Sequence, residues 1–300
     1  MDLNFILNYS GDYTVDIING SDHLFNEIRV GKKVIGTYNH ERIPEDNEII
    51  IIIGDYPVSR DSLVTSNPIR RNYRWALDFK YDYFEGHSCW DGIDSISIIN
   101  SDDRPDKLFD ILKEFKKMQV PLNKVYRQSA IFESPTNNHY VNGLFGCFKS
   151  HICNLQRLSK LEHNNMVIFE DDFTFTDPIE ENMNNISKFF NRGYTYDVLL
   201  LATSAEGNII QRDDLIGNSY QPCTTTSGYI LSKRGLGVIL PIWEKANEML
   251  CITGDFNKYA CDRYWSLIQV DNGMFTFNKK IGYQRPSISQ TSKSLSYNLD

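Results

Sequence analysis

The sequence predicts an α/β protein with a mostly parallel sheet, preceded by a small β-rich module. After about residue 90, apolar strands alternate with helical patterns, as expected for a parallel sheet covered on both faces. Met166–Phe169 is an apolar run without alternation, which is typical of a central strand buried on both faces. Before residue 90, short strand patterns are instead separated by turn residues.

The predicted N-terminal module covers residues 1–90. Tyr13–Ile18 and Glu48–Ile53 are strand patterns, and each is followed by turn residues. The module contains no nucleophile arrangement and no phosphate-binding loop. Packing, oligomerisation and acceptor binding are the roles open to it. Residues 91–300 form the second predicted domain.

The second domain opens with a strand and a well-marked helix. Ser95–Ile99 is a short apolar strand. In the helix that follows, Asp103 is the predicted N-cap and Pro105 lies near the first helical position. Five apolar residues then recur at helical spacing: Leu108, Ile111, Leu112, Phe115 and Met118. These patterns predict a strand followed by a helix that packs on the sheet.

Further along the chain the alternation continues. A second helix is predicted from about Gly143, and it leads into the strand Met166–Phe169. Val198–Leu201 and Tyr229–Leu231 are two more apolar strand patterns, and a helix is predicted to start near Ser232. This order of elements completes the predicted α/β domain.

Composition excludes several classes of partner. The net charge is -8 and the basic residues are scattered, whereas nucleic-acid binding needs clustered Lys and Arg. The longest apolar run, Ile49–Ile53, is far shorter than the roughly 20 residues that span a bilayer, so we expect no integral membrane segment. The N-terminus lacks the basic and apolar pattern of a secretory signal. We therefore expect a cytoplasmic protein.

The cysteines predict free thiols. The chain has six, with no Cys-x-x-Cys pair and no His at zinc-finger spacing. A structural disulfide or zinc site is therefore not expected from the spacing.

Three adjacent carboxylates, Glu170, Asp171 and Asp172, follow the buried strand. Ligands of open α/β sheets bind at the carboxyl ends of the strands, so this is where a site is expected. Adjacent carboxylates repel one another at the edge of a core unless a cation neutralises them, and Mg²⁺ or Mn²⁺ prefers such oxygen ligands. A metal here would bridge the phosphates of a nucleoside diphosphate. The alternative is a solvated acidic turn.

Ordered sequence blocks resemble glycosyltransferase family 25, whose members include lipopolysaccharide-modifying enzymes and collagen galactosyltransferases. The blocks run from Ile99 to Ser294, and they are Ile99–Lys107, Gly146–His151 (Gly-Cys-x-x-Ser-His), Val167–Asp172 (ending Glu-Asp-Asp), Gly228–Ser232 (Gly-Tyr-x-x-Ser), Asp262, and Pro286–Ser294. The first block departs from the family pattern at Ser101, Asp102, Asp103 and Lys107. The N-terminal module lies outside the resemblance.

The resemblance implies a GT-A-type, Rossmann-like fold and a metal-dependent inverting transfer. The donor would be a UDP-sugar, either UDP-galactose or UDP-glucose, with Mn²⁺ or Mg²⁺ as cofactor. The acceptor would be a hydroxyl on a glycan, a lipid-linked sugar or a protein.

The resemblance also assigns donor-site residues. Glu170 and Asp172 would hold the metal, and Asp171 completes the donor triplet. Asn100 and Arg104 would line the nucleotide pocket, and a guanidinium at a helix start suits phosphate. A surface ion pair is the other role open to Arg104.

His151 shares a helical face with Cys147, four residues before it, and is assigned to the donor side. A hydrogen-bonded core histidine is the alternative for His151.

Inverting transfer needs a base that takes the proton of the acceptor hydroxyl. Asp262 is the predicted base and Asp255 is its rival, and helix capping is the alternative role for either. No His follows His163, so an oxygen ligand such as Asp262 or Gln290 would have to close the metal shell from the C-terminal region.

Two other functions compete with glycosyl transfer. The altered first block suggests a catalytically inactive relative that binds glycan or protein, which would show no nucleotide affinity. A metal-dependent phosphohydrolase is the third hypothesis, but a second carboxylate or His cluster for a two-metal site is missing from the sequence.

Overall fold

The computed structural model describes residues 14–19, 26–30, 48–53, 74–77, 86–101, 104–204, 209–219, 223–265 and 273–285. The chain divides into two compact units, residues 1–86 with 100–129, and residues 87–99 with 130–300. The predicted boundary at residue 90 stays a prediction.

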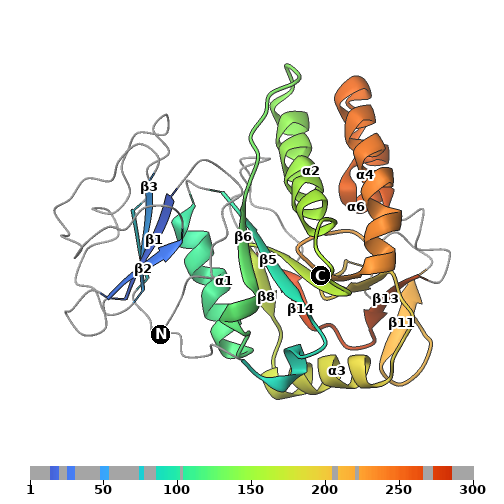
Figure 1. The fold of residues 1–300 in the computed structure, drawn as a ribbon. Coiled ribbons are helices and arrows are strands. Elements are labelled where there is room, and N and C mark those ends of the chain that lie inside the picture. The colour runs from blue at the N-terminus through green and yellow to red at the C-terminus, as the bar shows by residue number, and fades with distance from the viewer. Residues whose placement is uncertain are drawn as a thin grey trace. The chain divides into compact units, whose positions relative to one another are not determined.

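The described part of the first unit contains a four-stranded sheet, an α-helix, a short 3-10 helix and a further strand (Figure 1). Its elements are β1 (Thr14–Asn19), β2 (Asn26–Val30), β3 (Glu48–Ile53), β4 (Arg74–Leu77), α1 (Pro105–Lys117), η3 (Leu122–Lys124) and β6 (Val125–Ser129). The four N-terminal strands lie in the order β2-β1-β3-β4. β1 is antiparallel to β2 and parallel to β3, and β3 is parallel to β4.

Helix α1 begins at Pro105, as predicted, with Arg104 at the N-cap position. The prediction of Asp103 as N-cap is therefore wrong by one residue, and Asp103 itself lies outside the described residues. Arg104 makes no side-chain capping hydrogen bond, so the fixed φ of proline is what favours the start of the helix here. The five predicted apolar positions, Leu108, Ile111, Leu112, Phe115 and Met118, are all buried.

The second unit contains most of a large sheet. Its elements are η2 (Ser88–Trp90), β5 (Ser95–Asn100), α2 (His139–Leu158), β7 (Asn165–Glu170), β8 (Phe173–Phe175), α3 (Ile179–Asn191), β9 (Val198–Leu200), β10 (Ile209–Gln211), β11 (Ile216–Ser219), β12 (Gly228–Ser232), α4 (Lys233–Thr253), α5 (Phe256–Tyr259), α6 (Cys261–Tyr264), β13 (Met274–Phe277) and β14 (Gly282–Gln284). β14 and β8 form a separate antiparallel pair.

Most strands of this sheet run in the same direction, which confirms the predicted α/β class with a mostly parallel sheet. The order is β10-β11-β13-β9-β12-β7-β5. β5 is parallel to β7 and β13 is parallel to β9, while β12 is antiparallel to both β7 and β9. β11 is antiparallel to β13 and to β10. Hence β5, β7, β9, β13 and β10 run one way, and only β12 and β11 of this set run against them.

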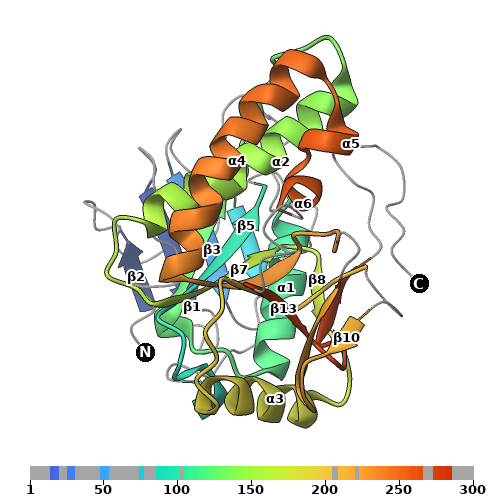
Figure 2. The same cartoon turned by 90° about the vertical axis from the view of Figure 1, so that its right-hand side faces the viewer.

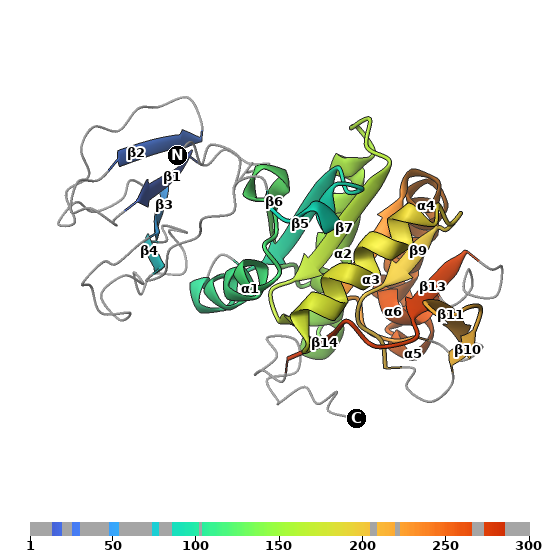
Figure 3. The same ribbon diagram turned by 90° about the horizontal axis from the view of Figure 1, so that it is seen from below.

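Helices cover both faces of the sheet, as predicted. α2 and α4 lie side by side on one face (Figure 2), and α3 lies across the other (Figure 3). The core beneath α2 and α4 joins Phe148 and Trp243 from the helices to Ile168, Leu200 and Leu231 from the strands. Among the described residues, no helix combines the length and the apolar character that crossing a bilayer requires.

Two predicted boundaries are wrong. α2 begins at His139, four residues before the predicted start at Gly143, because Asn138 caps it by accepting hydrogen bonds from the backbone N–H groups of Tyr140 and Val141. β7 extends one residue beyond Phe169, so Glu170 is its last residue rather than the first residue after it.

The start of α4 follows the prediction at Ser232. Its hydroxyl accepts a hydrogen bond from Gly235 N (3.0 Å) and donates one to the carbonyl of Tyr196 (2.7 Å). Gly235 packs against the backbone of Asp197, and a Cβ added at Gly235 would lie 2.1 Å from the carbonyl oxygen of Asp197. Two residues later, a Cβ added at Gly237 would meet no atom within 4 Å. The first turn of α4 therefore requires glycine only at Gly235.

We predict that Gly235→Ala lowers the free energy of unfolding by about 1–3 kcal/mol or more, because backbone atoms of Asp197 have to move. Gly237→Ala is the matched control on the same helix. It should be neutral or raise stability by up to about 1 kcal/mol, because alanine is the better helix former. Urea unfolding of both variants measures this difference, and equal effects would contradict the packing described here.

Candidate active site

The acidic triplet lies where β7 ends and the chain turns into β8. Glu170 is the last residue of β7 and its side chain is 18% exposed. Asp171 and Asp172 form the turn and are only 8% and 6% exposed. The triplet is therefore a largely buried group of carboxylates rather than a solvated acidic turn.

Glu170 is held by two side chains. Its Oε1 lies 3.1 Å from Nε2 of His151 and accepts a hydrogen bond of 2.6 Å from the hydroxyl of Thr226. His151 is fully buried, and its Nδ1 lies 3.1 Å from the hydroxyl of Tyr229. Since an ionised carboxylate only accepts, Nε2 of a neutral His151 carries the proton and Tyr229 donates to Nδ1. His151 thus orients Glu170.

The Gly-Cys-x-x-Ser-His block places its residues on two faces of α2. Gly146 faces the preceding loop, where an added Cβ would lie 2.4 Å from the carbonyl oxygen of Ile131. Ser150, four residues later, accepts a hydrogen bond of 2.7 Å from Ile131 N. Cys147 and His151 share a second face, and their ligand atoms lie close to Glu170. Gly146 and Ser150 therefore hold the loop at Ile131, and Cys147 and His151 lie beside the carboxylate of Glu170.

The Gly-Tyr-x-x-Ser block on β12 also combines packing residues with a residue of the site. An added Cβ at Gly228 would lie 2.4 Å from the ring of Phe173. Tyr229 bonds to His151, and Ser232 caps α4. The glycine and the serine therefore serve packing and capping, whereas the tyrosine serves the site.

A chain of hydrogen bonds links Asp172 to Asp262. Gln284 on β14 donates to Oδ2 of Asp172 (3.3 Å) and accepts from the hydroxyl of Thr225 (3.1 Å). The backbone N–H of Thr225 in turn donates to Oδ2 of Asp262 (3.2 Å). Thr225 has φ 80°, a conformation that a β-branched residue rarely adopts. These bonds hold its strained backbone in place, which is a frequent feature of functional sites.

Asp262 lies in the first turn of α6, directly after Cys261, whose sulfur lies 3.7 Å from the Thr226 hydroxyl that bonds to Glu170. Burial raises the pKa of Asp262, and the neighbouring charge of Glu170 raises it further, while the hydrogen bond from Thr225 opposes the change. A carboxylate with a raised pKa is a stronger base than an ordinary aspartate. The structure therefore brings the predicted base and the predicted metal ligand Glu170 together.

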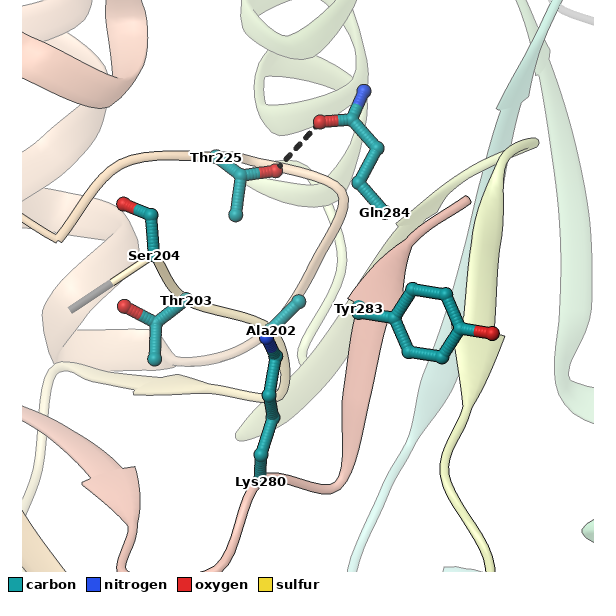
Figure 4. Close-up of a pocket in the computed structure, with 7 residues that line it drawn as sticks. All are labelled: Ala202, Thr203, Ser204, Thr225, Lys280, Tyr283 and Gln284. Carbon is teal, nitrogen blue, oxygen red and sulfur yellow. Dashed lines mark hydrogen bonds between the residues drawn. The ribbon is translucent and has the colours of Figure 1, made fainter. Parts of the chain in front are cut away.

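A hollow adjoins this chain of hydrogen bonds (Figure 4). Thr225 and Gln284 belong both to its wall and to the link between Asp172 and Asp262. The complete lining is Ala202, Thr203, Ser204, Thr225, Lys280, Tyr283 and Gln284. Its hydroxyl and amide groups are of the kind that bind polar ligands.

The six cysteines are all free thiols. Two of them, Cys147 and Cys261, lie at the site. Contact with the Cys261 thiol, burial and the charge of Glu170 raise the pKa of Cys147. The Cys261 sulfur lies 3.7 Å from the hydroxyl of Thr226, which also bonds to Glu170.

Carboxylate oxygens are the kind of ligand that a hard divalent cation prefers, and Glu170, Asp171 and Asp172 supply them within three consecutive residues. Among the described residues, however, the three carboxylates of the triplet do not form a group with ligand atoms within 4.8 Å of one another. Glu170 and Asp172 would hold such an ion.

Asn100 and Arg104 lie in the first unit. The Asn100 side chain donates to the carbonyl of Arg104 (3.0 Å) and accepts from Nε of Arg127 (2.9 Å). Asn100 therefore holds the backbone of Arg104 at the start of the helix.

Asp255 is exposed and caps α5 by accepting a hydrogen bond from Lys258 N (3.3 Å). The ring of its neighbour Phe256 contacts Tyr140, which precedes His151 by eleven residues on α2, or about 16 Å along the helix. Asp255 thus lies towards the far end of α2 from His151. Gln290 lies outside the described residues.

Three residues of the site were not predicted from the sequence: Thr225, Thr226 and Gln284. The run of threonines at 224–226, one residue before the Gly-Tyr block, was the available signal, because hydroxyls at a strand start can face a site. Gln284 gave none, since only the pairing of β14 with β8 brings it beside Asp172.

Comparison with known proteins gives one family match. The model of glycosyltransferase family 25, described as "LPS biosynthesis protein", matches residues 99–256, which is more than half of the chain. No curated protein matches the chain.

Twenty-one chains of solved structures match this chain, and two of them illustrate the likeness. One is a glycosyltransferase involved in the glycosylation of the major capsid of PBCV-1, with 11% identity over 61% of this chain and 81% of that chain, and a TM-score of 0.36. The other is mannose-1-phosphate geranyltransferase from Thermus thermophilus, with 6% identity over 64% and 73% of the two chains and a TM-score of 0.36.

We predict that Tyr229→Phe lowers the free energy of unfolding by about 1–3 kcal/mol, because it leaves Nδ1 of the buried His151 without its hydrogen bond. Tyr264→Phe is the control, since no hydrogen bond of its hydroxyl occurs within the described residues, and it should change stability by less than about 0.5 kcal/mol. Denaturant unfolding compares the two. Equal losses would show that the Tyr229 hydroxyl does not support His151.

Proposed function

Because the chain belongs to glycosyltransferase family 25, we propose that it transfers a hexose from a UDP-sugar to an acceptor hydroxyl with inversion. The hexose is galactose or glucose, and Mn²⁺ or Mg²⁺ assists the transfer. The acceptor is a hydroxyl of a glycan, a lipid-linked sugar or a protein.

The proposal rests on one observation, that two carboxylates, those of Glu170 and Asp172, lie at the end of β7. Glu170 and Asp172 accept hydrogen bonds from His151, Thr226 and Gln284, which orient the two carboxylates. A largely buried, negatively charged strand end is a favourable place for a divalent cation. A bound cation supplies charge neutralisation to the departing diphosphate.

The remaining donor residues have distinct parts in the proposal. Asp171 completes the triplet, and His151 acts by holding Glu170, because both of its ring nitrogens are engaged. Asn100 and Arg104 line the nucleotide pocket, with Arg104 at the start of α1, where helix geometry favours phosphate. Gln290 is the proposed contact from the C-terminal region.

Asp262 is the proposed base. It is tied to the hollow through Thr225, whose backbone N–H donates to its Oδ2. A single hydroxyl of the acceptor that enters the hollow would meet the hydroxyl of Ser204 and the amide of Gln284 at its wall. Asp262 would then take the proton of the attacking hydroxyl as the bond to the hexose forms.

Purified protein with Mn²⁺ and a panel of UDP-sugars should show transfer or slow donor hydrolysis, and calorimetry should show metal-dependent binding of UDP. Asp172→Asn should abolish that binding while leaving the fold intact, because one carboxylate ligand is lost. Asp91→Asn, at an exposed position, is the control. Full UDP binding by the Asp172 variant would remove the triplet from the mechanism, and glycan binding without nucleotide affinity would favour an inactive relative.

The choice between Asp262 and Asp255 is tested by replacing each with asparagine. Asp262→Asn keeps an acceptor for Thr225 N but cannot take a proton, so transfer should fall about a hundredfold or more with UDP binding retained. The transfer rate of Asp255→Asn should stay near that of wild type. Loss of activity only in the Asp255 variant would reverse the assignment.

The raised pKa of Asp262 also predicts a pH effect. Wild-type transfer should decline as pH falls through that pKa, since the protonated acid is no base. Wild-type transfer that stays constant through this pH range would contradict the role of Asp262 as the base.

A further inference from the structure

A second group of ligand atoms lies beside the triplet, on the side of α2. The Sγ of Cys147, a ring nitrogen of His151 and a carboxylate oxygen of Glu170 all lie within 4.8 Å of one another. Cys147 and His151 are one helical turn apart, and Glu170 reaches them from the end of β7. Three residues from two elements therefore converge on one point.

We propose that Cys147, His151 and Glu170 form a binding site for Zn²⁺ or a similar thiophilic divalent ion, which adjoins the hard-cation site of the triplet and shares Glu170 with it. Thiolate and imidazole select zinc over Mg²⁺ or Mn²⁺, whose preferred ligands are oxygens. The ion replaces the proton of the Cys147 thiol on binding.

The geometry fits this ion. Ligands at about 2.0–2.3 Å from tetrahedral zinc are about 3.4–3.8 Å apart. The separation of 3.1 Å between His151 Nε2 and Glu170 Oε1 is already close to that value. The longest separation among the three ligand atoms, at most 4.8 Å, requires a shift of only about 1 Å, which side-chain rotation provides.

The surroundings of His151 are those of a metal ligand. Its Nδ1 is engaged by the Tyr229 hydroxyl, and its ring packs against Tyr229 and Trp243. Such an outer hydrogen bond fixes the ring orientation and presents the other nitrogen to the ion. Once Nε2 binds the metal, Nδ1 carries the proton and the Tyr229 oxygen accepts it.

Glu170 belongs to both proposed sites. A carboxylate has two oxygens, so Oε1 can serve the site beside His151 while the second oxygen serves the nucleotide metal. The Cys261 sulfur is a neighbour of the Thr226 hydroxyl, which bonds to Glu170, and thus lies next to the zinc site as well.

The test uses the full chain after chelator treatment, without nucleotide, so that its outcome is independent of glycosyl transfer. Wild type should bind one equivalent of Zn²⁺, and Co²⁺ in its place should give a thiolate-to-metal charge-transfer band. Cys147→Ser should lose the band and bind zinc at least about tenfold more weakly. Cys153→Ser, at a half-buried cysteine of the same helix, is the matched control and should behave as wild type.

A measurement on the unaltered protein guards against a variant that fails to fold. Zinc should slow alkylation of Cys147 by iodoacetamide at least about tenfold and leave alkylation of Cys153 unchanged, as read by peptide mass spectrometry. The proposal is overturned if wild type takes up no stoichiometric zinc, if the two serine variants bind it alike, or if zinc leaves the labelling of Cys147 unchanged.

Discussion

Negative charge confined at the end of β7 is the constraint on which the rest of the site depends. Glu170 and Asp172 lie at the edge of a core, where an unpaired carboxylate is costly, and the protein surrounds them with donors instead of exposing them. His151 and Thr226 fix one carboxylate and Gln284 fixes the other. These donors orient the carboxylate oxygens, which are the ligands that a hard divalent cation prefers.

The surrounding elements contribute through two kinds of residue. Glycines and serines make the close approaches and caps that set the elements, as Gly146 does against the loop before α2 and Ser232 does at the start of α4. Chemically active side chains lie one residue away from the glycines, at Cys147 and Tyr229. A sequence block can therefore mark both a packing requirement and a functional one, and the structure is what separates the two.

Local signals predicted the elements well where burial and capping agree. The strand Glu48–Ile53 was predicted with its observed limits, and β5 and the start of α1 at Pro105 fell within a residue. The start of α2 was missed because the polar cap at Asn138 lies outside the apolar stripe. Contacts that depend on distant segments could not be predicted, such as Gln284 with Asp172 or Cys147 with Glu170, because no spacing in the chain encodes them.

Membership of the family accounts for the kind of reaction, and the geometry of the site accounts for how this chain would carry it out. The most direct test is a crystal structure with UDP and Mn²⁺, using the anomalous signal of manganese to place the ion. We expect the ion between the diphosphate and the carboxylates of Glu170 and Asp172, with Asp262 open to the acceptor side. Manganese bound elsewhere, or a diphosphate with no carboxylate of the triplet near its metal, would contradict the account.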